Sequence, residues 1–244
     1  YICPGIIDIH SDYLEREISP RPNTGFSYDL ALRYLDYRAV TCGITSLFNG
    51  ISYREDEGAK RSVNLSLEIG RKINSYIKEG LFLINHFIHA RLDTTTKRIF
   101  EVYDEIIEYE SLKMAVFNDH TPGTRQFRDI KKYKEYASDR SGMNSEELDK
   151  EIIRRQNKAK ETKHIRPLLS EKFKDHNIVL GSHDDTTVKH IKEAVKDRCS
   201  LSEFPTTMEA ARSAKENGLY VCMGATNLIL GKSQSGNISC LSLI

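Results

Sequence analysis

Short apolar runs alternate along the chain with longer stretches in which apolar residues recur at helical spacing. The short runs predict β-strands, and the stretches between them predict helices. Strand–helix–strand repetition is typical of a parallel sheet. The predicted strands lie at residues 5–10, 45–50, 81–93, 112–120, 177–185, 201–205 and 219–225.

Three of the predicted helices have recognisable ends. Residues 27–43 and 60–80 end at Gly43 and Gly80, and residues 206–218 begin with two threonines and end at Gly218. Threonine is a good helix N-cap, and glycine is common just after a helix. About seven such repeats favour either an open doubly wound sheet or a (β/α)8 barrel that lacks a strand.

Residues 127–165 interrupt this rhythm, because they are long, helical and strongly charged. The segment follows a strand end, so it is a candidate lid over a site. A charged helical segment is more often a solvated face, and we favour that interpretation. We expect residues 1–244 to form a single barrel domain that carries this helical insertion.

Composition excludes several classes of protein. A length of 244 residues suits one large α/β domain, and 39% hydrophobic with 29% charged residues is ordinary for a soluble protein. The net charge of +1 gives no global case for binding nucleic acid or an anionic membrane. The five cysteines are scattered without a CxxC pair, and no signal peptide or membrane span is visible, so we expect reduced thiols in a cytoplasmic protein.

Histidines and carboxylates collect at the predicted strand ends. His10 and Asp12 stand two residues apart and would project to the same side of a strand. Other strand ends carry His89 with Asp93, His120, and His183 with Asp184 and Asp185. One such histidine is usually a packing residue, and Asp184 or Asp185 is also a candidate helix cap. Four histidine-bearing strand ends together predict a site for Zn²⁺, Mn²⁺ or Fe²⁺.

Three loops have the composition of anion-binding sites. Residues 20–26, 121–127 and 231–237 combine glycine and hydroxyl residues with Arg21, Arg125 and Lys232, respectively. Each loop alone is also compatible with an ordinary turn. Because these loops follow the first, fourth and seventh predicted strands, beside the candidate metal ligands, the set favours a phosphorylated substrate.

Five motifs together carry a resemblance to a known family. They are PGIIDIHSDYLEREISPRP, NDHTPGTRQF, GSHDDTT, SEFPTTMEAAR and MGATNLILGKSQSGN, and they span nearly the whole chain in the same order. The sequence resembles the PhnM family of phosphonate metabolism, which belongs to the amidohydrolase superfamily. The resemblance implies a distorted (β/α)8 barrel with one or two divalent ions, zinc or manganese. The implied reaction is hydrolysis of α-D-ribose 1-methylphosphonate 5-triphosphate to the 5-phosphate and pyrophosphate in the carbon–phosphorus lyase pathway.

The resemblance also implies roles for residues. The implied metal ligands are His10, Asp12, Asp93, His120 and His183. The implied contacts to substrate phosphate or ribose are Arg21, Arg125, Gln126, Lys232, Ser235 and Asn237. The family takes its catalytic aspartate from the last barrel strand. Because the matching motif is not in this sequence, Asp184 and Asp185 become the candidates for the catalytic base.

The sequence departs from the family in further ways. We expect it to lack the last barrel strand and the small flanking β-sandwich, and it has Asp93 where the family usually has glutamate. Two other functions therefore stay open: a C–N hydrolase or deaminase on the same barrel, and a non-catalytic protein that keeps the binding pocket. An open barrel edge is a place where a second copy of the chain would bind, so a homo-oligomer is a further expectation.

Overall fold

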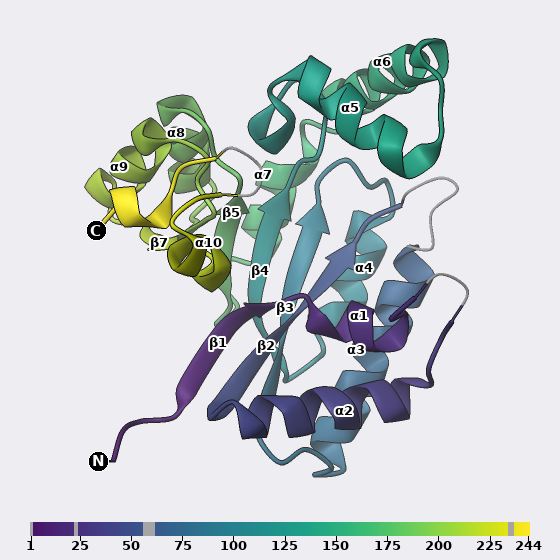
Figure 1. Ribbon diagram of the computed structural model, residues 1–244, viewed down its shortest axis with the longest axis vertical. Helices are drawn as coiled ribbons and strands as arrows, with labels where there is room; N and C mark the ends of the chain where they lie inside the picture. Colours follow the sequence, from purple (N-terminus) through teal and green to yellow (C-terminus); the bar gives the residue numbers. More distant parts are fainter. Residues whose placement is uncertain (1, 22–23, 56–61, 234–236) are drawn as a thin grey trace. The chain divides into compact units, whose positions relative to one another are not determined.

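The computed structural model describes residues 2–21, 24–55, 62–233 and 237–244, which form an α/β fold (Figure 1). The described strands belong to one seven-stranded sheet and follow one another in chain order from β1 to β7. Neighbouring strands pair in parallel in β1–β2, β2–β3, β5–β6 and β6–β7. This order is consistent with consecutive strands of an α/β barrel. The strands are β1 (Ile6–Ser11), β2 (Ile44–Tyr53), β3 (Asn85–Asp93), β4 (Leu112–Asn118), β5 (Val179–His183), β6 (Leu201–Glu203) and β7 (Tyr220–Cys222).

All seven predicted strands are present. The third begins at Asn85 rather than at residue 81, because Asp36 accepts hydrogen bonds from the backbone N–H groups of Leu83 and Ile84. The helices are α1 (Tyr13–Ile18), α2 (Tyr28–Thr41), α3 (Val63–Lys78), α4 (Ile99–Ile106), α5 (Ile130–Ser141), α6 (Ser145–Glu161), α7 (Ile165–Lys172), α8 (Val188–Lys196), α9 (Met208–Glu216) and α10 (Ala225–Leu230), with 3-10 turns η1 (Arg125–Phe127) and η2 (Cys240–Ser242).

Packing divides the chain into two compact units. The first unit comprises Tyr1–Leu92 and Arg98–Ala115, and the second comprises Asp93–Lys97 and Val116–Ile244. The division runs through β3 and β4, so the carboxyl ends of these two strands belong to the second unit. The prediction of a single barrel domain is not tested by this division and stays a prediction.

The first unit is built around β1, β2 and β3. Helices α2 and α3 both contact β2, and their apolar faces bury side chains such as Leu32 and Ile73. The two predicted helix ends are confirmed, since Gly43 and Gly80 have left-handed φ values of 75° and 65°. Ser27 caps α2 by accepting a hydrogen bond from the N–H of Leu30.

The second unit is built around the end of β4 and strands β5, β6 and β7. Thr187 and Thr207 cap α8 and α9, so the predicted threonine cap of the last long helix is confirmed. Their hydrophobic faces bury Ile191 and Ala210. Strands β5 and β6 are in register, and His183 is the Cα partner of Glu203.

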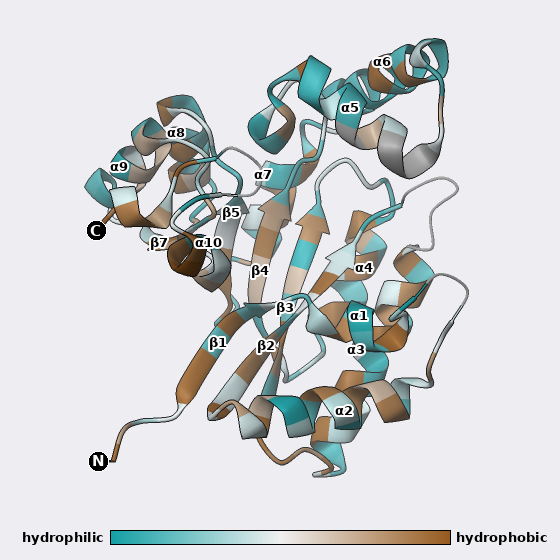
Figure 2. Ribbon diagram, viewed as in Figure 1, coloured by the Kyte–Doolittle hydropathy of each residue, from teal (hydrophilic) through white to brown (hydrophobic). Residues whose placement is uncertain are grey.

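The charged segment at residues 127–165 is helical, as predicted, and it contains helices α5 and α6. Gly142 ends α5 in a left-handed conformation, and Asn144 begins α6 with a capping box that includes Glu147. Both helices are largely hydrophilic (Figure 2). This is the pattern of a solvated face, which the sequence favoured over a lid.

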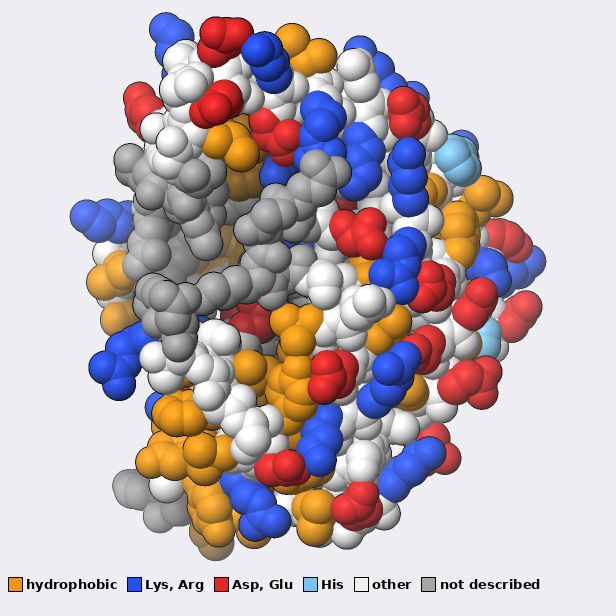
Figure 3. Space-filling model, turned by 90° about the vertical axis from the view of Figure 1, so that its right-hand side faces the viewer, with side chains coloured by type: hydrophobic (Ala, Val, Ile, Leu, Met, Phe, Trp, Pro, Cys, Tyr) orange, Lys and Arg blue, Asp and Glu red, His pale blue; other side chains and the backbone are white. Residues whose placement is uncertain are grey.

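Charges of both signs are interspersed on the face shown in Figure 3. The view agrees with the net charge of +1, because no large area of one sign dominates that face. In the part of the chain that the structure describes, no helix has the length and apolarity needed to cross a membrane.

Candidate metal and phosphate site

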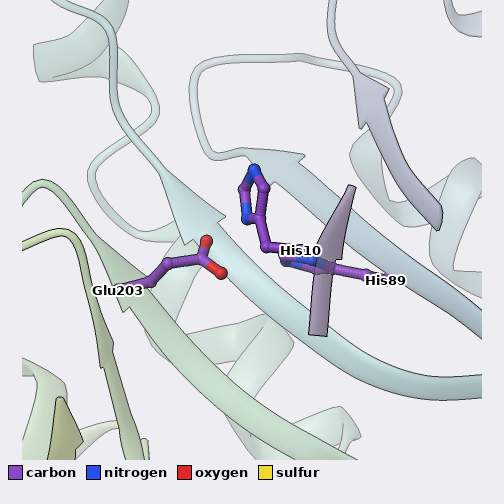
Figure 4. Close-up of side chains that lie close together, drawn as sticks. All are labelled: His10, His89 and Glu203. Atoms are coloured by element: carbon purple, nitrogen blue, oxygen red, sulfur yellow. The ribbon is translucent and has the colours of Figure 1, made fainter. Parts of the chain in front are cut away.

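In the first unit, His10 at the end of β1 lies beside His89 of β3 (Figure 4). Their rings meet edge to face with centroids 5.0 Å apart, and a ligand nitrogen of each lies within 4.8 Å of the other. His89 is completely buried. Two imidazoles at this separation fit a divalent ion of the zinc or manganese type, which takes nitrogen ligands. Glu203, the third side chain drawn in Figure 4, belongs to the second unit.

Asp12, the other predicted ligand in this unit, takes part in an ion pair. Its Oδ1 accepts a hydrogen bond of 2.9 Å from Nη1 of Arg91, and its Oδ2 lies 3.5 Å from Nε2 of His10. The Asp12 side chain is 52% exposed. Asp12 therefore stays next to His10, as the two-residue spacing predicts, while Arg91 holds one of its oxygens.

In the second unit, Asp93 at the end of β3 contacts His120, which follows β4. Oδ2 of Asp93 lies 3.1 Å from Nδ1 of His120, and Oδ1 accepts hydrogen bonds from the backbone N–H and the hydroxyl of Thr95. Burial raises the pKa of Asp93, but the bonds from His120 and Thr95 outweigh it and lower the pKa to about 2. Asp93 is thus ionised and fixes the orientation of the His120 ring.

His183, the last residue of β5, is flanked by two carboxylates. Its Nδ1 lies 2.7 Å from Oδ2 of Asp184, and its Nε2 lies 3.5 Å from Oε2 of Glu203 at the end of β6. The ring of Phe204 meets the His183 ring edge to face at 5.4 Å. The side chains of His183, Asp184 and Glu203 are all buried. Such a mixture of imidazole and carboxylate again suits a divalent ion.

Arg125, which is predicted to bind phosphate, is buried against Asp185. Its Nη1 bonds to Oδ1 of Asp185, and the same Oδ1 accepts a hydrogen bond of 2.8 Å from the hydroxyl of Ser182. Its Nη2 bonds to Glu193 of α8 at 3.1 Å. Arg125 is 4% exposed and Asp185 is fully buried. In this arrangement the guanidinium is engaged by protein carboxylates, and Asp185 is the less accessible of the two aspartates after β5.

Three turns at strand ends of the second unit hold a non-glycine residue in the left-handed region. The φ values are 45° for Arg125, 57° for Asp184 and 53° for Phe204. Backbone N–H groups anchor two of these turns, since Asp184 donates to the carbonyl of Glu203 and Phe204 donates to the carbonyl of Cys222. Strain of this kind persists where the surroundings fix it, and it is common at functional sites.

The remaining predicted substrate contacts lie in loops. Arg21, Gln126 and Lys232 are exposed, and Arg21 forms an isolated bridge with Thr24. Asn237 is half-buried. Ser235 lies outside the described residues. Their predicted roles stay predictions.

Two residues outside the implied set of metal ligands also lie at strand ends. His89 is two strand positions before Arg91 and four before Asp93, so its side chain points to the same side as theirs. Glu203 is the register partner of His183. The sequence had already placed His89 among the histidines at strand ends, whereas the contact of Glu203 with His183 depends on the pairing of β5 with β6.

Comparison with known proteins supports the resemblance seen in the motifs. Over 245 aligned positions, the chain is 29% identical to the α-D-ribose 1-methylphosphonate 5-triphosphate diphosphatase of Escherichia coli (strain K12). This similarity supports the resemblance to the PhnM family. The alignment covers 100% of this chain and 65% of the relative, so the chain spans less than two thirds of that protein. No protein-family model matches the chain, and no solved structure matches it.

Proposed function

We propose that this chain carries the metal-dependent diphosphatase site of a phosphonate-pathway hydrolase. The proposed reaction is hydrolysis of α-D-ribose 1-methylphosphonate 5-triphosphate to the 5-phosphate and pyrophosphate. The observation that carries the proposal is the set of histidines at the carboxyl ends of β1, β4 and β5, namely His10, His120 and His183, each with a carboxylate within 3.5 Å. The similarity to a curated diphosphatase supports the choice of substrate.

For one or two ions, zinc or manganese, we propose as ligands His10, Asp12 and His89 in the first unit. In the second unit, we propose Asp93, His120, His183 and Glu203. The donor set of imidazole and carboxylate fits these metals. An ion bound there would acidify a water molecule and neutralise charge on phosphoryl oxygens. Asp93 engages Nδ1 of His120, so Nε2 is the nitrogen that His120 offers to a ligand.

Asp184 is the carboxylate that we propose as the general base. It lies 2.7 Å from His183, so a proton taken from an attacking water can be shared with the imidazole. Asp185 is a poorer candidate, because its Oδ1 is engaged by Arg125 and Ser182. The exposed cations Arg21 and Lys232, with Gln126, Ser235 and Asn237, are the proposed contacts to the leaving pyrophosphate or the ribose.

The test is pyrophosphate release from the ribose triphosphate by the 244-residue chain with added Zn²⁺ or Mn²⁺. We expect the double variant His120→Ala/His183→Ala to lose turnover, and His164→Ala to retain it, because His164 is exposed and makes no side-chain cap bond. Release of ammonia from an amide or amine substrate would instead indicate a C–N hydrolase. Metal binding without turnover at high protein concentration would indicate a binding protein. We propose no nucleic-acid or membrane partner, and a homo-oligomer stays a prediction.

A further inference from the structure

Asn118, the last residue of β4, has a buried amide without a hydrogen bond. The residue is 2% exposed. Neither its Oδ1 nor its Nδ2 has a hydrogen-bond partner among the described residues. A buried amide that is not paired lowers the stability of the folded state, so such a group calls for an explanation.

The backbone around Asn118 is fixed, so the unpaired amide is not the result of a loose chain end. The carbonyl of Asn118 accepts hydrogen bonds from the N–H of Thr94 at 3.0 Å and from its hydroxyl at 3.2 Å. The next residue, Asp119, turns its carboxylate away to the N–H of Thr121 at 2.9 Å. The amide of Asn118 is therefore held in place with both of its polar atoms unused.

The neighbours of Asn118 follow from the register of β4 and β5. A methyl group placed on Gly181 would lie 2.9 Å from Cγ2 of Val116, so these two residues are adjacent and face the same side. Two residues further along each strand, Asn118 and His183 again share that side. Because His183 is the register partner of Glu203, these three residues form one row across β4, β5 and β6. All three belong to the second unit.

We propose that Asn118 is a ligand-binding residue of this row and that its Nδ2 donates a hydrogen bond to a phosphoryl oxygen of the substrate. A neutral amide suits this role. A positively charged side chain beside His183 would pair with Glu203, whereas the amide of Asn118 can donate to a bound anion. The class of ligand rests on the proposed function. The unpaired state of the amide rests on the structure and is independent of it.

The test uses the 244-residue chain with Asn118→Leu, an apolar replacement of similar size. Because the wild-type amide is unpaired, we expect this variant to raise the thermal midpoint of the metal-free protein by roughly 2–4 °C. We also expect it to raise the dissociation constant of inorganic pyrophosphate in the presence of MnCl₂ about tenfold, measured by calorimetry. A residue with a purely structural role would not stabilise the protein and weaken the ligand together.

The matched control is Asn49→Leu. Asn49 is also buried, and its Oδ1 likewise has no partner among the described residues. Its Nδ2, however, donates to the carbonyl of Phe87 at 3.1 Å and contacts Nδ1 of His86 at 3.2 Å. We expect Asn49→Leu to lower the thermal midpoint of the metal-free protein. An unchanged or lower midpoint in Asn118→Leu would overturn the inference, because the amide would then be satisfied by a buried water or by the protein.

The outcomes separate this inference from the proposed function. Pyrophosphate binding that Asn118→Leu leaves unchanged overturns the inference and leaves the proposed function standing. A second outcome is that Asn118→Leu weakens pyrophosphate binding while the wild-type chain releases no pyrophosphate from the triphosphate. That outcome supports the inference and counts against the proposed reaction. A wild-type chain that binds no pyrophosphate with the metal overturns both.

Discussion

The guanidinium of Arg125 and the carboxylate of Asp185 form a buried ion pair that ties the turn after β4 to the turn after β5. Nη1 of Arg125 also donates a hydrogen bond of 3.4 Å to the carbonyl of His183. His183 is the central residue of the candidate site in the second unit. The pair therefore holds the end of β5 in place from a neighbouring loop. Removing one partner from such a pair is costly, because the remaining charge stays buried.

We expect Arg125→Met to lower the free energy of unfolding by about 3–5 kcal/mol, measured by urea denaturation. The double variant Arg125→Met/Asp185→Leu should recover most of that loss, since neither charge then remains in the interior. Arg71→Met, which removes an exposed pair with Glu105, is the control and should change stability little. A single Arg125 variant as stable as the wild type would contradict the assignment of Arg125 as a structural support.

Contact between Gly181 and Val116 sets the distance between β5 and β4. A methyl group on Gly181 would lie 2.9 Å from Val116 and 3.4 Å from Cβ of Leu201. We expect Gly181→Ala to lower the free energy of unfolding by about 1–3 kcal/mol because it overpacks this point. Val116→Ala introduced into the same chain should restore part of the loss by making room. If the double variant is no more stable than Gly181→Ala alone in urea denaturation, the two strands do not meet at these residues.

His86 should make stability depend on pH. Its Nε2 lies 3.2 Å from Oδ1 of Asp36, but burial disfavours the charged imidazolium and lowers the pKa of His86 below its ordinary value of 6.5. The folded state therefore takes up this proton at a lower pH than the unfolded state. The contribution of His86 to stability is fully present above pH 6.5 and is lost as the pH falls toward the folded-state pKa.

We expect the urea midpoint to fall between pH 7 and pH 5, and to fall less steeply in His86→Gln. Burial also lowers the pKa of His190, so the variant should keep a part of the slope. The measurement compares midpoints of both proteins at several pH values in that range. Parallel curves for the two proteins would show that His86 titrates alike in the folded and unfolded states.

Asp93 should be needed for tight metal binding whether it binds the ion or orients His120. We expect Asp93→Asn to weaken Zn²⁺ binding about 10–100-fold in competition with a chelator. Thr95→Val, which removes the hydroxyl that bonds to Oδ1 of Asp93, should weaken it less. Asp149→Asn is the control, because Asp149 forms an exposed pair with Lys134. Equal zinc affinities in Asp93→Asn and the control would show that Asp93 does not serve the metal site.

The strands and their carboxyl-end chemistry were predictable because both depend on short-range patterns. Apolar runs located all seven strands, and the spacing of His10 and Asp12 placed both beside each other at the end of β1. Asp93 and His120 come from different strands, yet they were predictable as neighbours in function because both follow strand ends. A parallel sheet brings those ends to one edge.

The surroundings of individual side chains were not predictable. The composition of the loop at residues 121–127 suggested that Arg125 faces a phosphate, but its partners, Asp185 and Glu193, lie 60 and 68 residues further along the chain. The pairing of His183 with Glu203 depends on the register of β5 and β6 in the same way. No local pattern reports a contact over such a separation, and Ser235 stays without a structural description.

Arg125, Asp184 and Phe204 occupy turns whose backbone glycine would adopt more easily. A left-handed residue with a side chain costs about 1–3 kcal/mol, and the second unit bears this cost at three successive strand ends. Selection for stability alone would favour glycine at Asp184 and Phe204, whereas the buried ion pair with Asp185 opposes it at Arg125. A laboratory search for heat-tolerant variants of this chain would therefore tend to remove a carboxylate and an aromatic ring from the surroundings of His183. Sequences recovered from such a search should be assayed for metal and pyrophosphate binding before they are taken as improved proteins.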